Sequence, residues 1–271
     1  SIRRQRQMCI RDRGTLCVIT RAVIKLYPKS AAAATLVVPF NSRSDALMAV
    51  HRILQSAVLP LAIEYAEMRE LNEAAKHLNE EWPVQTGKAQ LIVMLTGTTE
   101  DELLSACGTV AKISEENNAS EVMLAETKEE QERILRIRSN IYTTLKPEII
   151  DILDVTVPPS RLGDLMNFVD EIAEKHGVHL PVYGHAGDGN LHVHIMKEEY
   201  KEPDYVADVK RDIYMAGVRL GGVITGEHGI GKIRTGDITL VLGEKELGLM
   251  KGIKKLFDPN GILNPGVLPL A

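Results

Sequence analysis

The sequence lacks the features that mark several specialised classes of protein. Its three cysteines, Cys9, Cys17 and Cys107, are far apart and form no CxxC pair, so neither a disulfide framework nor a cysteine zinc site is indicated and a reducing compartment is expected. Aromatic residues make up 4% of the chain, and no basic patch with interleaved aromatics supports nucleic-acid binding. No apolar run reaches the roughly 20 residues that cross a bilayer or marks a secretory signal. We therefore expect a protein of the cytoplasm, free or peripheral to the membrane, and not transmembrane.

Positive charge is concentrated at the N-terminal end. Residues 1–13, SIRRQRQMCIRDR, hold five arginines and one aspartate, whereas the whole chain of 271 residues has a formal charge of −5. A basic arm can bind nucleic acid or anionic lipid. Because the rest of the chain supports neither partner, we interpret residues 1–13 as a non-native or disordered arm outside the fold. The remaining composition, with 44% hydrophobic and 25% charged residues overall, is typical of a globular protein.

Strand and helix patterns recur along the chain after this arm. Residues 14–30 are rich in Val, Ile and Thr and predict one or two strands that stop at Pro28. Three strand, helix, strand units then follow, over residues 31–68, 89–126 and 152–196, with an extra charged helix at 128–146. Further helices are predicted at 202–222 and from residue 244 onward, the last one ended by Pro259 and Gly261. The pattern predicts an α+β or α/β fold with helices packed on a sheet.

Histidines cluster in YGHAGDGNLHVHI, residues 183–195. In its second half, polar and apolar residues alternate, which predicts a strand with His192 and His194 on one face. The preceding Gly-Asp-Gly at 187–189 is typical of a hairpin turn, which brings His185 back opposite His192. Two imidazoles on neighbouring strands suit a divalent transition metal, with a carboxylate from elsewhere completing the site. The alternative is a polar sheet face in which the histidines only form hydrogen bonds.

A second unusual segment is GGVITGEHGIG, residues 221–231. Gly226, Gly231 and Lys232 fit part of a phosphate-binding loop, but Ile233 stands where that loop needs Ser or Thr to hold magnesium. The glycines instead allow the backbone to approach a flat ligand closely. Glu227 and His228 are adjacent and point opposite ways in an extended segment, so one can ligate a metal while the other faces a reacting carbon. The alternative is a turn with a solvated acid and base.

These two segments, together with LFDPNGILNPG at residues 256–266, resemble the C-terminal half of the FAD-linked 2-hydroxy-acid dehydrogenases, the group of glycolate oxidase FAD subunits, D-lactate dehydrogenases and D-2-hydroxyglutarate dehydrogenases. The resemblance implies an α+β fold. It consists of a ferredoxin-like cap domain, in which helices cover one face of an antiparallel sheet, and a helical C-terminal segment. It divides the chain into the last strands of a truncated FAD-binding domain (14–30), a cap or substrate domain (31–215) and a return segment (216–271) that carries GEHGIG and NPG. The resemblance implies that the rest of the FAD-binding domain is missing from this sequence.

The resemblance also implies roles for individual residues. His185, His192 and Glu227 correspond to ligands of a divalent metal such as Zn, Mn or Fe, and His228 to the base that faces the flavin. A metal that binds the hydroxyl and carboxylate of the substrate lowers the pKa of the hydroxyl, His228 removes the proton, and C2 gives hydride to flavin N5. His194 matches a substrate-contacting position, and Asn264 matches a residue close to the flavin.

A carboxylate substrate also needs a cation, and arginine offers bidentate geometry. Arg138 best matches the family's substrate arginine, with Arg136 as the alternative. Ile152 occupies the position of a lysine present in some relatives, which favours glycolate or D-lactate over D-2-hydroxyglutarate. The expected function is FAD-dependent oxidation of such an acid to its 2-oxo acid, although this truncated chain should bind FAD poorly and show little or no turnover.

The resemblance implies an electron-accepting protein as partner, such as an electron-transfer flavoprotein, an iron–sulfur subunit or a cytochrome, and allows a homodimer. Three other classes of function are considered beside it. A metal-dependent hydrolase would use the same histidines with a metal-bound water. A flavin-dependent transferase related to the ether-lipid synthases would show no net redox change, and the intact GHAGDGNLH argues against it. The fragment could also serve as a non-catalytic interaction module.

Overall fold

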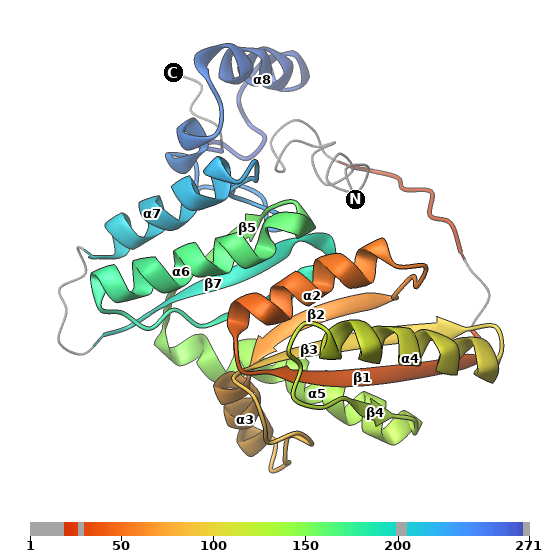
Figure 1. Ribbon diagram of the computed structural model, residues 1–271. Helices are drawn as coiled ribbons and strands as arrows, with labels where there is room; N and C mark the ends of the chain where they lie inside the picture. The colour runs from red at the N-terminus through yellow and green to blue at the C-terminus, as the bar shows by residue number, and fades with distance from the viewer. Residues whose placement is uncertain (1–18, 27–29, 199–204, 268–271) are drawn as a thin grey trace.

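A single antiparallel sheet organises the computed structural model, which describes residues 19–26, 30–198 and 205–267. Seven strands of the described residues form this sheet in the order β4-β1-β3-β2-β6-β7-β5 (Figure 1). The strands are β1 (Ala32–Phe40), β2 (Ala62–Glu67), β3 (Ala89–Gly97), β4 (Met123–Ala125), β5 (Ile149–Thr156), β6 (Val182–His185) and β7 (Asn190–Met196).

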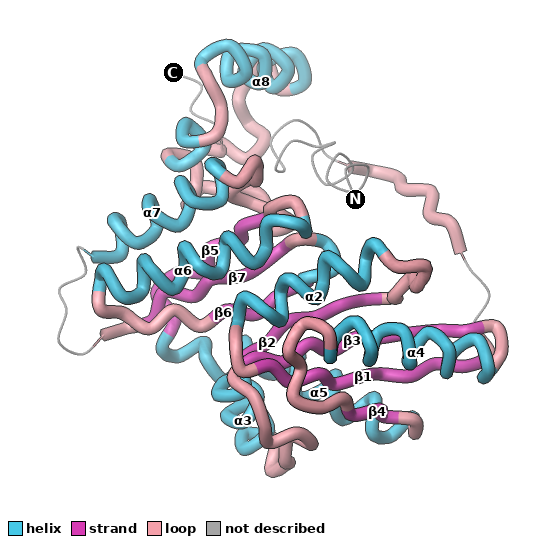
Figure 2. The backbone as a smooth tube through the Cα atoms, in the orientation of Figure 1, coloured by secondary structure: helices cyan, strands magenta, loops and turns pink. Residues whose placement is uncertain are grey.

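Helices cover both faces of the sheet (Figure 2). Over the described residues they are α2 (Arg43–Gln55), α3 (Met68–His77), α4 (Glu100–Glu115), α5 (Lys128–Leu145), α6 (Leu162–His176), α7 (Tyr205–Arg219) and α8 (Glu244–Phe257). Helices α2, α4, α6 and α7 supply the apolar side chains that pack on one face, and α3 and α5 cover part of the other. The α+β class and the antiparallel sheet are confirmed, and α3 with α5 forms a layer beyond the single one predicted.

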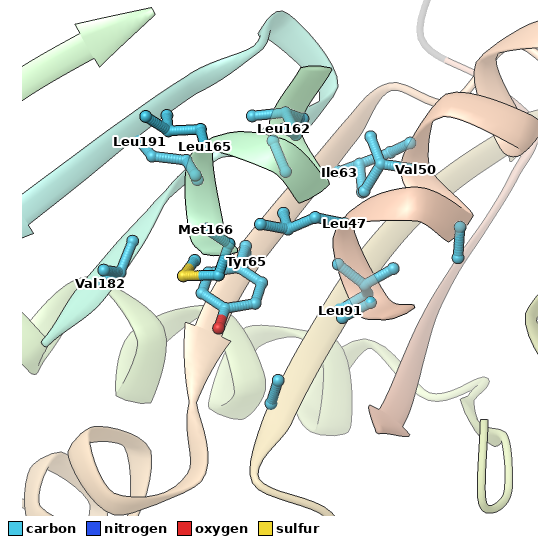
Figure 3. Close-up of a cluster of buried hydrophobic side chains, with 14 of the residues drawn as sticks. Leu47, Val50, Ile63, Tyr65, Leu91, Leu162, Leu165, Met166, Val182 and Leu191 are labelled. Carbon is cyan, nitrogen blue, oxygen red and sulfur yellow. The ribbon is translucent and has the colours of Figure 1, made fainter. Parts of the chain in front are cut away.

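The two layers follow from strands that are apolar on both sides. In β1, Leu36 and Val38 belong to the larger core under α2 and α4, whereas Val37 between them belongs to the smaller core under α3 and α5. Since successive side chains of a strand point to opposite faces, such a strand needs cover on each side. Figure 3 shows part of the larger core, where Leu47 of α2 and Met166 of α6 lie near Tyr65 of β2.

Threonine and serine caps define several helix starts. Thr127 and Glu130 form a complete capping box at the start of α5, and Ser42 and Thr99 accept hydrogen bonds from backbone N–H groups in the first turns of α2 and α4. These caps satisfy N–H groups that have no partner inside the helix. Helix α5 packs on the sheet through the smaller core, and Arg138 is among its buried residues.

The hairpin between β6 and β7 differs from the prediction in its register. His185 is opposite Asn190, and His192 is opposite Tyr183, so His185 does not lie directly across from His192. The reason is the connection, a 3-10 turn over Ala186–Asp188 followed by Gly189 at φ 78°, which is longer than a two-residue turn. A side chain on Gly189 would come within 2.1 Å of the Val157 carbonyl oxygen. His185 and His192 are therefore diagonal neighbours on one face.

The two ends of the chain carry less of the core. Residues 19–26 form no strand and are exposed, so the strands predicted within 14–30 are not found over this described part, where no neighbouring strand supplies hydrogen-bond partners. Residues 1–13, Cys9 and Cys17 lie outside the described residues.

The boundary predicted between residues 215 and 216 falls inside α7. No helix in the described ranges has the length and apolar character needed to cross a bilayer.

Candidate functional site

A row of polar side chains crosses three neighbouring strands on the face opposite the larger core. Tyr183 of β6, His192 of β7 and Asp154 of β5 are register partners. Their neighbours Leu191, Val193 and Val155 point the other way, into the larger core. The alternation that predicted a strand thus places His192 and His194 on one face, as expected.

The glycine-rich segment 221–231 is bound to this row by its backbone. Val223 and Thr156 exchange two backbone hydrogen bonds, and the Gly226 N–H donates to the Asp154 carbonyl at 3.0 Å. The N–H groups of Glu227 and His228 both donate to Asp154 Oδ2 at 2.8 Å. A Cβ on Gly226 would lie 2.2 Å from Thr156 Oγ1. Only a glycine permits this approach, which brings Glu227 over the hairpin histidines.

Three imidazoles surround the Glu227 carboxylate. Glu227 Oε1 lies 3.3 Å from His185 Nε2, 3.5 Å from His192 Nε2 and 3.7 Å from His228 Nε2. His185, His192 and Glu227 each offer a ligand atom within 4.8 Å of the other two, as do Asp154, His192 and His228. The structure therefore brings together the predicted ligand set, with the predicted base beside it.

The site is buried on the sheet side and open on the other. His192 is buried, whereas the side chains of Glu227 and His228 are 43% and 59% exposed. The hydrogen bond from His192 and the charges of His185, His192 and His228 lower the pKa of Glu227 to about 2, against the effect of its partial burial. A hydrogen bond to Glu64 raises the pKa of His185. Glu227 thus supplies an anionic oxygen at neutral pH.

His194 lies in a different environment from His192. It is fully buried, stacks on Tyr183 with ring centroids 4.5 Å apart, and its Nδ1 lies 3.2 Å from the Pro181 carbonyl oxygen. Burial lowers the pKa of His194 to about 4, so the ring is neutral at pH 7. Its register partner on β5 is Ile152. This is the position at which some members of the family that the sequence resembles carry lysine.

The two arginines that are candidates for binding a substrate carboxylate differ in burial. Arg138 is buried, pairs with Glu64 at 2.7 Å and lies over the Tyr183 ring with its Cζ 4.8 Å from the centroid. The Arg136 side chain is 53% exposed and pairs with Glu80 at 2.7 Å. The geometry favours Arg138, whose partners Glu64 and Tyr183 both adjoin the histidine cluster, through His185 and His192.

Asn264 is not brought to the cluster. It is exposed, has φ 44°, and accepts a hydrogen bond from the Val267 N–H through its carbonyl at 3.2 Å. Asp258 organises this segment, because its carboxylate accepts the N–H groups of Ile262 and Leu263, each at 2.9 Å. Among the described residues, no hydrogen bond or ion pair joins Asn264 to the histidine cluster.

Sequence analysis did not identify Asp154, Glu64 or Tyr183 as members of the site. Two of them stand between apolar residues: Asp154 between Leu153 and Val155, and Glu64 between Ile63 and Tyr65. A charged residue flanked by apolar residues within a strand is a signal that could have found these two. Their partners are 73 and 121 residues away in sequence, which no local pattern indicates.

Comparison with known proteins gives the class, because a model of the FAD-linked oxidases matches most of the chain. The chain belongs to the FAD-linked oxidase family, since the family model described as FAD linked oxidases, C-terminal domain, matches residues 29–268. It is 37% identical over 259 residues to D-lactate dehydrogenase of Archaeoglobus fulgidus, covering 96% of this chain and 56% of that protein. It is 29% identical to glycolate oxidase subunit GlcD of Bacillus subtilis, again covering 96% and 56%. The chain thus spans about half the length of these relatives.

Solved structures show the same fold at low sequence identity. p-Cresol methylhydroxylase with substrate bound matches with a TM-score of 0.64 and 14% identity, over 90% of this chain and 54% of that one. Alkyldihydroxyacetonephosphate synthase matches with a TM-score of 0.52 and 18% identity, over 93% and 48%. The predicted family and fold class are confirmed, and FAD is the cofactor that the family implies.

Proposed function

We propose that this chain is the substrate-binding part of an FAD-linked dehydrogenase that oxidises D-lactate, glycolate or a similar small 2-hydroxy acid to the 2-oxo acid. The single observation that supports this most is the convergence of His185, His192 and Glu227 beside His228. The proposal agrees with the names of two relatives whose alignments cover 96% of this chain, a D-lactate dehydrogenase and a glycolate oxidase subunit.

The three donors fit a divalent metal. Two imidazole nitrogens and one carboxylate oxygen suit Zn, Mn or Fe, and three protein ligands leave positions for a substrate. The Nε2 atoms of His185 and His192 both face Glu227 Oε1, while Nδ1 of His185 is already bonded to Glu64. A bound divalent ion would supply positive charge to the hydroxyl and carboxylate oxygens of a 2-hydroxy acid.

His228 is proposed as the base that takes the hydroxyl proton at Nε2. Its backbone is fixed by Asp154, and its ring contacts that of His192 with centroids 5.2 Å apart, while the side chain remains 59% exposed toward the open side. A neutral imidazole can accept a proton near neutral pH. FAD, when bound, would supply the hydride acceptor for oxidation at C2 of the substrate. The glycine backbone and the exposed imidazole would accommodate a flat ring on this side. Asn264, which the structure does not bring to the cluster, is proposed near the flavin on the family resemblance alone.

Arg138 is proposed to bind the substrate carboxylate. It is a buried guanidinium held by Glu64 and Tyr183 on the side of the cluster formed by β6. Ile152 offers no second cation beside His194, which favours substrates with one carboxylate over D-2-hydroxyglutarate. For the whole protein we propose a cytoplasmic location, with electrons passed from flavin to a separate electron-accepting protein.

Calorimetric titration of the chain with D-lactate and glycolate, in the presence and absence of Zn²⁺ or Mn²⁺, tests this function. Propionate, which has the carboxylate of lactate without its hydroxyl, is the matched control ligand. We expect the hydroxy acids to bind at least tenfold more tightly when metal is present and propionate to show no such gain. Equal gains for lactate and propionate would contradict metal-assisted recognition of the hydroxyl. Ester or amide cleavage without flavin would favour the hydrolase alternative.

A further inference from the structure

We infer that Glu64 is a positioning residue, which holds the His185 ring in the tautomer that leaves Nε2 free to bind the proposed metal. The inference rests on the metal site of the proposed function and extends it to a residue outside the ligand set. Glu64 belongs to β2, which pairs with β6 through Tyr65 and Gly184. The sheet itself therefore sets Glu64 beside His185.

The contact between the two side chains is short and sheltered. Glu64 Oε1 lies 2.8 Å from His185 Nδ1, and the Glu64 side chain is 12% exposed. An ionised carboxylate can only accept hydrogen bonds, so Nδ1 must carry the proton. In a neutral imidazole the lone pair is then on Nε2, the atom that faces Glu227 Oε1 at 3.3 Å. A second-layer carboxylate of this kind fixes both the tautomer and the ring orientation of a histidine ligand.

Arg138 holds the other oxygen of the same carboxylate. Its Nη2 donates to Glu64 Oε2 at 2.7 Å, and its guanidinium lies over Tyr183, the register partner of His192. With one oxygen on the arginine and the other on the histidine, Glu64 cannot rotate without losing a partner. It therefore connects the proposed carboxylate-binding arginine to the proposed metal ligand and fixes the position of one relative to the other.

His192 lacks a comparable hydrogen bond at Nδ1 in the described part of the chain, so this role of Glu64 is specific to His185. Asp154 Oδ1 lies 3.6 Å from His192 Nδ1, and the other oxygen, Oδ2, accepts two backbone N–H groups. Asp154 thus positions the backbone of the glycine-rich segment, whereas Glu64 bonds directly to an imidazole ring. Replacing Glu64 should change His185 first and leave the segment that carries Glu227 in place.

The test compares Glu64→Gln with Glu80→Gln by zinc titration. Glutamine keeps the shape of glutamate, but when its oxygen accepts from His185 its NH₂ faces the Arg138 guanidinium, donor against donor. Glu80 is the matched control, because it pairs with Arg136, which lies on α5 as Arg138 does. In the described part of the chain, Glu80 is not an ion-pair partner of His185 or His192. We expect Glu64→Gln to weaken zinc binding by about 10- to 100-fold and Glu80→Gln to leave it unchanged.

A second measurement distinguishes positioning from loss of fold. Long-range ¹H–¹⁵N spectra of the zinc-loaded chain should show the proton of His185 on Nδ1 in wild type, with that signal lost or exchanging rapidly in Glu64→Gln. Unchanged affinity and an unchanged His185 signal would overturn the inference, as would an equal loss of affinity in Glu80→Gln. If wild-type chain binds no zinc, the proposed metal site itself fails, an outcome separate from either result.

Discussion

The carboxylate of Asp154 lies 2.8 Å from the backbone nitrogen of His228 and accepts its N–H, and the same oxygen accepts the N–H of Glu227. One buried side chain therefore orients two consecutive functional residues without touching their side chains. This relationship explains how a segment with so many glycines holds a defined conformation next to the sheet.

Replacing Asp154 by alanine should cost stability and metal affinity together. Each backbone N–H that loses a buried acceptor costs about 1–3 kcal/mol, and the segment that carries Glu227 loses its attachment. Urea unfolding and zinc titration of Asp154→Ala measure the two effects. Asp258→Ala is the control, since Asp258 also accepts two backbone N–H groups but lies in the C-terminal segment. A comparable loss of zinc affinity in both variants would contradict a specific role.

Close packing of the glycine-rich segment predicts a strong effect at Gly226. In Gly226→Ala the new Cβ would lie 2.2 Å from Thr156 Oγ1 and 2.5 Å from Asn190 Nδ2, so the segment must move. We expect a loss of about 1–3 kcal/mol from overpacking and weaker zinc binding. Gly236→Ala, where nothing lies within 4 Å of the added Cβ, should bind zinc like wild type. Wild-type stability and affinity in Gly226→Ala would show that the approach is not tight.

Acid should weaken the C-terminal segment through Asp258. Burial alone would raise the pKa of this carboxyl, but hydrogen bonds from Leu263, Ile262 and Lys254 outweigh burial and lower it below its usual value. Because the folded pKa is depressed, the stabilisation is present above the unfolded pKa of 3.8 and is lost as pH falls through the folded value. Unfolding free energies below pH 5 should fall less steeply in Asp258→Asn than in wild type. Parallel curves would exclude this contribution.

An apolar stripe on α8 predicts association. Leu249, Ile253, Leu256 and Phe257 are spaced for one side of the helix, and their exposed fractions run from 39% to 79%. Contiguous exposed apolar surface promotes contact with other protein surface. Light scattering should show concentration-dependent self-association that Leu256→Glu reduces. Leu59→Glu, which changes an exposed leucine elsewhere, should have no such effect. An equal effect of both changes would point to net charge instead.

The sequence was most informative where chemistry is local. The alternation of Leu191, Val193 and Ile195 with polar residues predicted β7 and its histidine-bearing face, and the strand, helix, strand unit predicted over 31–68 contains β1, α2 and β2. The register of His185 could not be read from the Gly-Asp-Gly pattern, because a 3-10 turn and Gly189 lengthen the connection. The layer formed by α3 and α5 depends on both faces of β1 being apolar, which periodicity alone does not reveal.

The sequence predicted the candidate ligands and base of the site, but not the residues that position them. His185, His192, Glu227 and His228 were found through motifs that resemble a family, and the structure brings them together. Asp154 and Glu64 act through contacts across 73 and 121 residues. Such contacts exist only once the strands are paired, so they follow from tertiary structure and not from any window of sequence.

The most direct test of the account is the metal content of the purified chain after loading with Zn²⁺ or Mn²⁺ and removal of the excess, compared between wild type and His192→Ala. His51→Ala, which changes a histidine on α2 outside both candidate metal groups of the described residues, controls for non-specific binding. We expect one metal ion per wild-type chain and per His51→Ala chain, and a loss of more than tenfold in affinity in His192→Ala. Equal metal content in wild type and His192→Ala would contradict the site on which the proposed function depends.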